Sequence, residues 1–204
     1  LATDSLFLTG FVLDDSTVVS TSRTISSLSG NTALYWRVRG KNTSGTGVWS
    51  SRWSFSTSDQ VTNTYSYLDS WNVVSVPLTV GDFRKSVVFP STASNAFAFD
   101  PAAGYVQRDT LGNGLGYWLK FNGAQNVPFT GTVRLLDSID VHLGWNLIGT
   151  ITNPVAVTDV VQVPTGIVQS SFYGYNGSYT PADTLHPARA YWVKVNQTGK
   201  LVLH

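Results

Sequence analysis

One segment of this chain occurs twice at a fixed spacing, and this repetition constrains the fold more than any other feature. Residues 70 to 74 (Ser-Trp-Asn-Val-Val) return 74 positions later as residues 144 to 148 (Gly-Trp-Asn-Leu-Ile). Residues 117 to 120 (Tyr-Trp-Leu-Lys) return at the same offset as Tyr-Trp-Val-Lys. Self-similarity at a fixed period indicates a structural unit that is used more than once. We therefore predict two related β units, 66 to 135 and 136 to 204, packed together.

The composition favours strands and leaves almost no net charge. Charged residues make up 12% of the 204 residues, about half the usual share of about 25%. Ser, Thr, Asn, Gly and Val are abundant, as is typical of neutral, β-rich extracellular modules. The net charge of +1 provides no field to attract nucleic acid, and no stretch approaches the roughly 18 apolar residues of a membrane span. We expect an all-β, exported protein with no nucleic-acid partner and no membrane span.

Residues 1 to 58 alternate apolar and polar residues in short runs separated by turn clusters, a pattern typical of antiparallel strands. In the clearest run, Leu34, Trp36 and Val38 point to one face. Trp36 is therefore predicted to anchor a core. The polar stretch from 59 to 65 has no periodicity and is predicted to be a linker.

Four segments of this first region carry a family resemblance. They are residues 4 to 7 (Asp-Ser-Leu-Phe), 28 to 32 (Leu-Ser-Gly-Asn-Thr), 35 to 39 (Tyr-Trp-Arg-Val-Arg) and 53 to 57 (Trp-Ser-Phe-Ser-Thr). Together they resemble the second half of a fibronectin type III domain, over about 55 residues against the roughly 100 of a complete sandwich. Leu34 stands where the family has its corner tyrosine. The resemblance implies an incomplete, partial sandwich over residues 1 to 58.

Such a half sandwich has an open edge and an uncovered apolar face, because the family's first strands would precede Leu1. Two explanations stay open. Either the chain has been trimmed, or a strand from a neighbouring chain completes the sheet, which is a known mode of association.

The repeats carry a second resemblance, in residues 144 to 149 (Gly-Trp-Asn-Leu-Ile-Gly), 116 to 120 (Gly-Tyr-Trp-Leu-Lys) and 190 to 194 (Ala-Tyr-Trp-Val-Lys). These pieces are similar to C-terminal regions of large secreted or surface proteins of Bacteroidetes-like bacteria. The resemblance implies an accessory region of a bacterial protein that is secreted or held at the cell surface. It implies no chemistry.

No group of residues has the pattern of a catalytic or metal site. Asp109 and Asp183 occupy equivalent places before Thr-Leu, which favours a role in fixing turns over the carboxylate pair of a glycosidase. His142 and His186 stand in no ligand-spaced motif, and no Gly-x-Ser-x-Gly segment is present. The chain contains no Cys, which excludes disulfides and thiolate chemistry. We predict a protein that is not an enzyme, with no cofactor and no metal.

The aromatic residues provide the best indication of a binding site. Strand alternation places Trp118 beside Lys120 on the face opposite the core, and places Trp192 beside Lys194 in the second copy. A flat ring beside a cation is suited to stacking on a sugar. It is equally suited to burial between the repeats with the Lys stem folded over the ring.

The loop from 172 to 179 is a second exposed-aromatic candidate. It contains Tyr173, Tyr175 and Tyr179 around an Asn176-Gly177 turn, which is a strong hairpin signal. The corresponding part of the first repeat has fewer hydroxyls, so a site in only one copy would explain the difference.

Together these features predict a non-catalytic extracellular module with a structural or adhesive role. It would serve as a spacer or as an assembly-forming part of a surface protein, through self-association or a strand shared with a neighbouring chain. The alternative is a carbohydrate-binding accessory module of a secreted hydrolase, with a polysaccharide as its partner.

Overall fold

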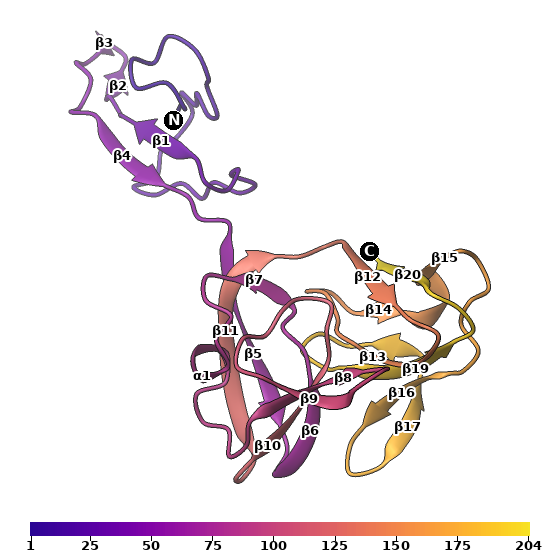
Figure 1. Ribbon diagram of the computed structural model, residues 1–204. Helices are drawn as coiled ribbons and strands as arrows, with labels where there is room; N and C mark the ends of the chain where they lie inside the picture. Colours follow the sequence, from indigo (N-terminus) through magenta and orange to yellow (C-terminus); the bar gives the residue numbers. More distant parts are fainter. The chain divides into compact units, whose positions relative to one another are not determined.

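The computed structural model describes all 204 residues, and it confirms the all-β prediction. Its strands form antiparallel sheets, and its helical segments are limited to α1 (Lys85–Val88) and the 3-10 turn η1 (Val157–Asp159). No helix is long and apolar enough to cross a membrane. The chain divides into two compact units, Leu1–Asp59 and Gln60–His204 (Figure 1), and each is described by itself below.

The first unit contains little regular structure. Strand β1 (Ala33–Trp36) pairs with β4 (Trp53–Ser56), and the short β2 (Lys41–Asn42) pairs with β3 (Gly45–Thr46). Leu34, Ala2 and Phe7 are the buried apolar residues of this unit.

Trp36 does not anchor a core, so that prediction was wrong. Its side chain is 38% exposed, and its cross-strand partner Trp53 is 62% exposed. The two rings stack at a centroid distance of 6.4 Å. Alternation correctly placed Trp36 and Leu34 on one face, but a two-stranded sheet provides no second layer to cover the whole of that face.

The first repeat begins at the start of the second unit. Its strands are β5 (Gln60–Tyr67), β6 (Ser70–Val74), β7 (Leu78–Val80), β8 (Ala96–Asp100), β9 (Gly104–Arg108), β10 (Tyr117–Phe121) and β11 (Gln125–Val133). They form a four-stranded sheet, β6-β10-β8-β9, and a three-stranded sheet, β5-β11-β7. Residues 60 to 65, expected to be a linker, lie in β5, which pairs with β11 along its whole length.

The second repeat follows the same plan. Its strands are β12 (Asp137–Val141), β13 (Gly144–Ile148), β14 (Val155–Ala156), β15 (Val161–Val163), β16 (Phe172–Tyr175), β17 (Tyr179–Ala182), β18 (Thr184–Leu185), β19 (Tyr191–Val195) and β20 (Gly199–Leu203). The sheet β13-β19-β16-β17 corresponds to the four-stranded sheet of the first repeat. In the three-stranded sheet β12-β20-β15, β12 and β20 correspond to β5 and β11, while β15 takes the third place without being the equivalent of β7 at the 74-residue offset. β14 and β18 form a separate pair.

Each repeat encloses its own core between its two sheets. In the first, Leu119 and Phe121 of β10 lie in one cluster with Val127 and Phe129 of β11. In the second, residues of β19 and β20 lie in a corresponding cluster. Each repeat is therefore a small β-sandwich with apolar side chains between its layers.

The repeated Asn of the sequence motif has a defined structural role. The amide of Asn72 donates to the Leu68 carbonyl at 2.9 Å and accepts from the Leu68 N–H at 3.1 Å. Asn146 makes the same pair of bonds with His142, at 2.7 and 2.9 Å. Each Asn thus closes the turn that joins the first two strands of its repeat.

Reciprocal backbone contacts join the two repeats. Val74 bridges to Arg189, and Ile148, the equivalent of Val74, bridges to Leu115, the equivalent of Arg189. A contact of i with j that is matched by one of j with i is the signature of a two-fold relationship. The repeats therefore pack about an approximate two-fold axis within one compact unit.

Small and polar residues allow this close approach. A Cβ on Gly149 would lie 2.8 Å from the Leu115 carbonyl oxygen. The buried hydroxyls of Ser75 and Thr150, one from each repeat, are 3.0 Å apart. Alongside them, Val73, Leu147, Ala190 and Trp192 form a third apolar cluster between the repeats.

Candidate aromatic binding site

The four-stranded sheet of the first repeat turns an aromatic face away from its core. In β10, Leu119 and Phe121 are buried in the core, so Trp118 and Lys120 lie on the other face. Strand register places Trp118 opposite Phe97 of β8, and Lys120 opposite Trp71 of β6. The Trp71 ring contacts both Phe97 and Trp118, with centroids 6.3 and 6.2 Å apart.

The second repeat builds the same arrangement from equivalent strands. Trp192 of β19 lies opposite Tyr173 of β16, and Lys194 lies opposite Trp145 of β13. The Trp145 ring contacts Tyr173 at 6.2 Å and Trp192 at 6.4 Å.

A hairpin from the other repeat completes each cluster. The β16–β17 hairpin places Tyr175 4.8 Å and Tyr179 6.5 Å from Trp118, both edge-to-face. The β8–β9 hairpin places Phe99 4.7 Å and Tyr105 6.5 Å from Trp192, again edge-to-face. Edge-to-face geometry is favoured because the positive edge of one ring meets the negative face of the other.

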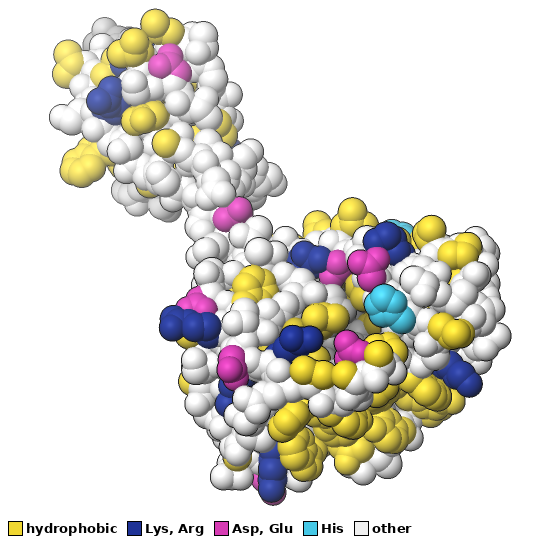
Figure 2. All heavy atoms as spheres, viewed as in Figure 1, with side chains coloured by type: hydrophobic (Ala, Val, Ile, Leu, Met, Phe, Trp, Pro, Cys, Tyr) yellow, Lys and Arg dark blue, Asp and Glu magenta, His cyan; other side chains and the backbone are white.

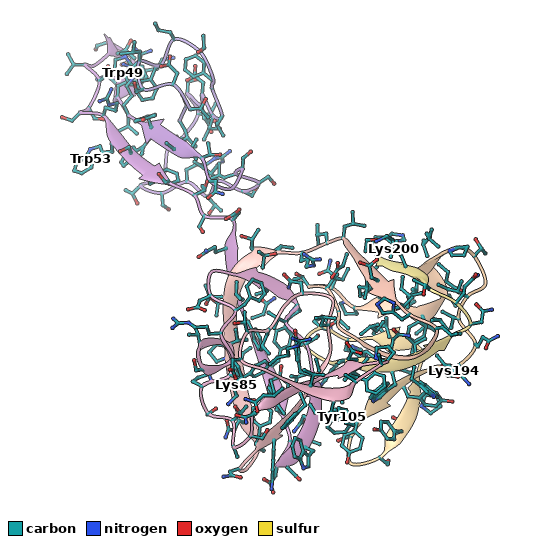
Figure 3. All side chains as sticks on the ribbon, viewed as in Figure 1. Trp49, Trp53, Lys85, Tyr105, Lys194 and Lys200 are labelled. Atoms are coloured by element: carbon teal, nitrogen blue, oxygen red, sulfur yellow. The ribbon has the colours of Figure 1, made fainter.

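The result is a surface of ten rings, which we call the aromatic face. Hydrophobic side chains gather over β9, β16 and β17 in Figure 2, in the region where Figure 3 labels Tyr105. The ten rings are those of Trp71, Phe97, Phe99, Tyr105, Trp118, Trp145, Tyr173, Tyr175, Tyr179 and Trp192.

Four of these rings are open to solvent, and they form two equivalent pairs. Trp71 and Trp145 are 39% and 41% exposed, while Tyr105 and Tyr179 are 55% and 52% exposed. Trp192 is only 8% exposed, and Trp118 is half-buried. The outer rings are therefore the most accessible to a ligand, Trp118 is partly accessible, and the buried Trp192 supports its neighbours.

An open groove of about 440 Å³ lies on this surface, and every residue that lines it is aromatic. The volume is within the range of about 300–1,000 Å³ that is typical of small-ligand sites. The lining residues are Trp71, Phe97, Tyr105, Trp118 and Tyr175.

The polar groups at the aromatic face are few. Lys120 and Lys194 are exposed, and each lies across from an exposed Trp in the strand register. The buried Nε1 atom of Trp118 has no hydrogen-bond partner, and that of Trp192 lies near the Tyr179 hydroxyl without a well-formed hydrogen bond. Desolvation by the surrounding rings raises the pKa of the Tyr179 hydroxyl, and nearby Tyr105 adds to the rise. Like any tyrosine hydroxyl, it is a neutral donor and acceptor at physiological pH.

The seven residues predicted as candidate glycan contacts all lie at the aromatic face or beside it. Trp118, Tyr175 and Tyr179 contact one another in one cluster. Trp192 and Tyr173 lie in the other, and Lys120 and Lys194 flank the two clusters. Of the two uses that the sequence left open for Trp192, its burial favours packing between the repeats.

Three exposed rings were not predicted from the sequence: the two most accessible Trp rings of the aromatic face, and Tyr105. Trp71 and Trp145 stand in the repeated motif itself, and alternation with the buried residues Val73 and Leu147 assigns them to the outer face. Tyr105 is the equivalent of Tyr179 at the 74-residue offset. The repeat therefore contained the signal for all three.

The remaining polar residues form structural contacts. Asp109 accepts a hydrogen bond from Gln107 at 3.2 Å, and the His186 N–H donates to the Tyr191 hydroxyl at 2.9 Å. No group of three His, Cys, Asp or Glu side chains is arranged to hold a metal ion.

Comparison of the chain with protein-family models, with curated proteins and with solved structures gave no match.

Proposed function

We propose that this chain is a non-catalytic adhesive module of an exported bacterial protein, and that its aromatic face binds a glycan. The observation that supports this most is the groove lined only by aromatic side chains, bordered by exposed Trp71 and Tyr105. Pyranose rings present C–H groups on their flat faces and hydroxyls at their edges. Flat indoles together with tyrosine hydroxyls are complementary to both kinds of group.

The exposure of Trp71 and Trp145 favours a binding role over a purely structural one. A ring that serves only to join the repeats is expected to be covered, as Trp192 is. Trp71 and Trp145 lie at the outer margin of the clusters and keep about two fifths of their surface in water. Contiguous exposed apolar surface on a folded protein marks an interaction site more often than not.

The test is retention on insoluble polysaccharides such as cellulose, chitin and xylan. We expect the wild-type chain to be retained on at least one of them. The double variant Trp71→Ala/Trp145→Ala should lose that retention. Trp49→Ala is the matched control, because it removes a Trp of the same exposure, 40%, from the other unit. No retention on any glycan, or equal retention of all three proteins, would refute the proposal.

A second candidate role is self-assembly through the first unit, taken as fibronectin type III-like. It is supported by the open face of the β1–β4 sheet, where Trp36, Trp53 and Phe55 are all exposed and no charged side chain lies opposite them in the strand pairing. A second copy of the same neutral face is the proposed occupant. Light scattering over a dilution series tests it: the wild type should form oligomers, and Trp53→Ser should be monomeric. A monomeric wild type at high concentration would exclude this role.

A further inference from the structure

The aromatic face divides into two subsites that the approximate two-fold axis relates. The first subsite consists of Trp71, Phe97, Trp118, Tyr175 and Tyr179. The second consists of Trp145, Tyr173, Trp192, Phe99 and Tyr105. In each, three rings come from one repeat and two from the hairpin of the other. Both subsites present one exposed Trp and one exposed Tyr.

The two subsites adjoin one another. Tyr105 contacts Trp192 of the second subsite, yet it also lines the groove over the first. Tyr105 lies near its equivalent Tyr179 and contributes to the raised pKa of that hydroxyl. The pair marks the junction, so the aromatic face is one continuous surface and not two separate pockets.

We propose, resting on the glycan-binding function above, that the ligand is a linear, uncharged polysaccharide chain that lies across both subsites at once. The chain would stack on Trp71 in one subsite and on Trp145 in the other, and would pass the Tyr105–Tyr179 junction between them.

The scarcity of charged side chains at the aromatic face favours an uncharged ligand. Lys120 and Lys194 are the only charged side chains that strand pairing places beside its Trp residues, one at each subsite. Recognition of carboxylate or sulfate groups usually relies on arginine forks that form paired hydrogen bonds. No arginine lines the groove on the aromatic face, and its rings favour contact with the C–H groups of a sugar.

The two-fold relationship favours an extended chain over a chain end. A chain that crosses the axis meets the same five-ring arrangement twice, but in opposite directions along its length. Stacking of a ring on the flat face of a sugar does not depend on the direction of the chain, so it tolerates this reversal. A pocket for a terminal sugar would instead need one closed end. Two weak sites joined by one ligand can bind about 10²–10⁴ times more tightly than either site alone.

The experiment is calorimetry with a ladder of oligosaccharides, from the disaccharide upward, prepared from a polysaccharide that retains the protein. Short members should bind weakly, with two molecules per protein. Above a threshold length, one molecule should bind per protein, with affinity higher by about 10²-fold or more.

Equivalent single variants provide the sharper test. Trp71→Ala and Trp145→Ala should each remove the gain that long members show, a loss of about 10²-fold, and should leave one short molecule bound per protein. Trp49→Ala, which removes an exposed Trp from the other unit, should change neither value. Should either alanine variant unfold, Trp71→Leu and Trp145→Leu repeat the comparison, since leucine keeps apolar contact with the neighbouring rings but presents no flat face.

Equal affinity for short and long members, with two molecules bound throughout, would overturn the two-subsite inference and leave glycan binding intact. Binding confined to acidic polysaccharides and abolished by salt would also overturn it. Failure of every glycan to bind would instead refute the proposed function on which the inference rests.

Discussion

The indole of Trp118 lies edge-to-face against the ring of Tyr175, with centroids 4.8 Å apart, although the two residues belong to different repeats. The contact between Trp192 and Phe99 repeats this geometry at 4.7 Å with the repeats exchanged. Neither repeat holds a complete subsite by itself, because each supplies the hairpin that completes the other. The binding face is therefore a product of docking between the repeats.

Docking depends on the close approach of backbone at Gly149. A methyl group on this residue would lie 2.8 Å from the Leu115 carbonyl oxygen, an atom that cannot rotate away. We expect Gly149→Ala to lower the free energy of unfolding by about 1–3 kcal/mol, measured by urea denaturation. Gly81→Ala is the control, since no atom lies within 4 Å of its added Cβ. Equal stability of the two variants would show that the repeats can move slightly apart without a loss of stability.

The inner and outer Trp rings should differ in their effect on stability. Trp192 is 8% exposed, so Trp192→Ala should cost about 3–5 kcal/mol. Trp145 is 41% exposed, so Trp145→Ala should lower the free energy of unfolding by clearly less. Chemical denaturation of both variants measures the difference.

Trp192→Phe is a separate prediction, because the buried Trp192 Nε1 atom lies near the Tyr179 hydroxyl but makes no well-formed hydrogen bond. Phenylalanine keeps a ring in the cluster and removes the unpaired donor, whose burial is unfavourable by about 1–3 kcal/mol. The variant should therefore be much closer in stability to the wild type than Trp192→Ala is. A loss as large as that of the alanine variant would indicate that the N–H donates to the Tyr179 hydroxyl.

The turn-closing residues Asn72 and Asn146 should contribute equally to stability. Each side chain makes three hydrogen bonds with the preceding turn. Replacement by Ala leaves partly buried backbone groups of the turn unpaired, and we expect each variant to lose about 1–3 kcal/mol in thermal or urea unfolding. Asn153→Ala serves as the control because Asn153 is exposed.

Buried tyrosines predict a loss of stability at alkaline pH. Burial raises the pKa of Tyr117 from 10.0 to about 12, and it also raises the pKa of Tyr67 and Tyr191. Between these two pH values the unfolded chain releases the Tyr117 proton and the folded chain keeps it. The stabilisation is therefore complete below pH 10.0 and is lost as the pH rises through about 12.

For Tyr117 alone the decline should approach about 1.4 kcal/mol per pH unit within that window. Urea denaturation at a series of alkaline pH values measures it, and Tyr117→Phe should show a shallower decline. Identical slopes for the variant and the wild type would show that Tyr117 titrates normally.

Local patterns predicted much of the second unit. The 74-residue offset correctly identified β13 as the equivalent of β6 and β19 as the equivalent of β10. The hairpin predicted at Asn176-Gly177 is present as β16 and β17. The prediction of a linker over 59 to 65 failed because its polar residues alternate in a strand with one covered face, β5, where only every second side chain needs to be apolar.

The candidate site was predicted in part, for a related reason. Alternation assigned Trp118 and Trp192 to the outer face, and both lie there. It did not reveal that Trp192 would be covered by Phe99 and Tyr105 while Trp145 stayed exposed. In the first unit, the same pattern did not reveal that Trp36 would lack a covering layer.

The sequence by itself determined the strands, the faces of each strand and the existence of two equivalent units, since these follow from periodicities of 2 and of 74 residues along one chain. Only the tertiary structure decided which outer faces are buried and which stay open. That choice depends on contacts between residues far apart in the chain, such as Trp118 with Tyr175, and on the close approach that Gly149 allows. A strand pattern specifies that a side chain points away from its own core, but the docked partner determines what, if anything, covers it.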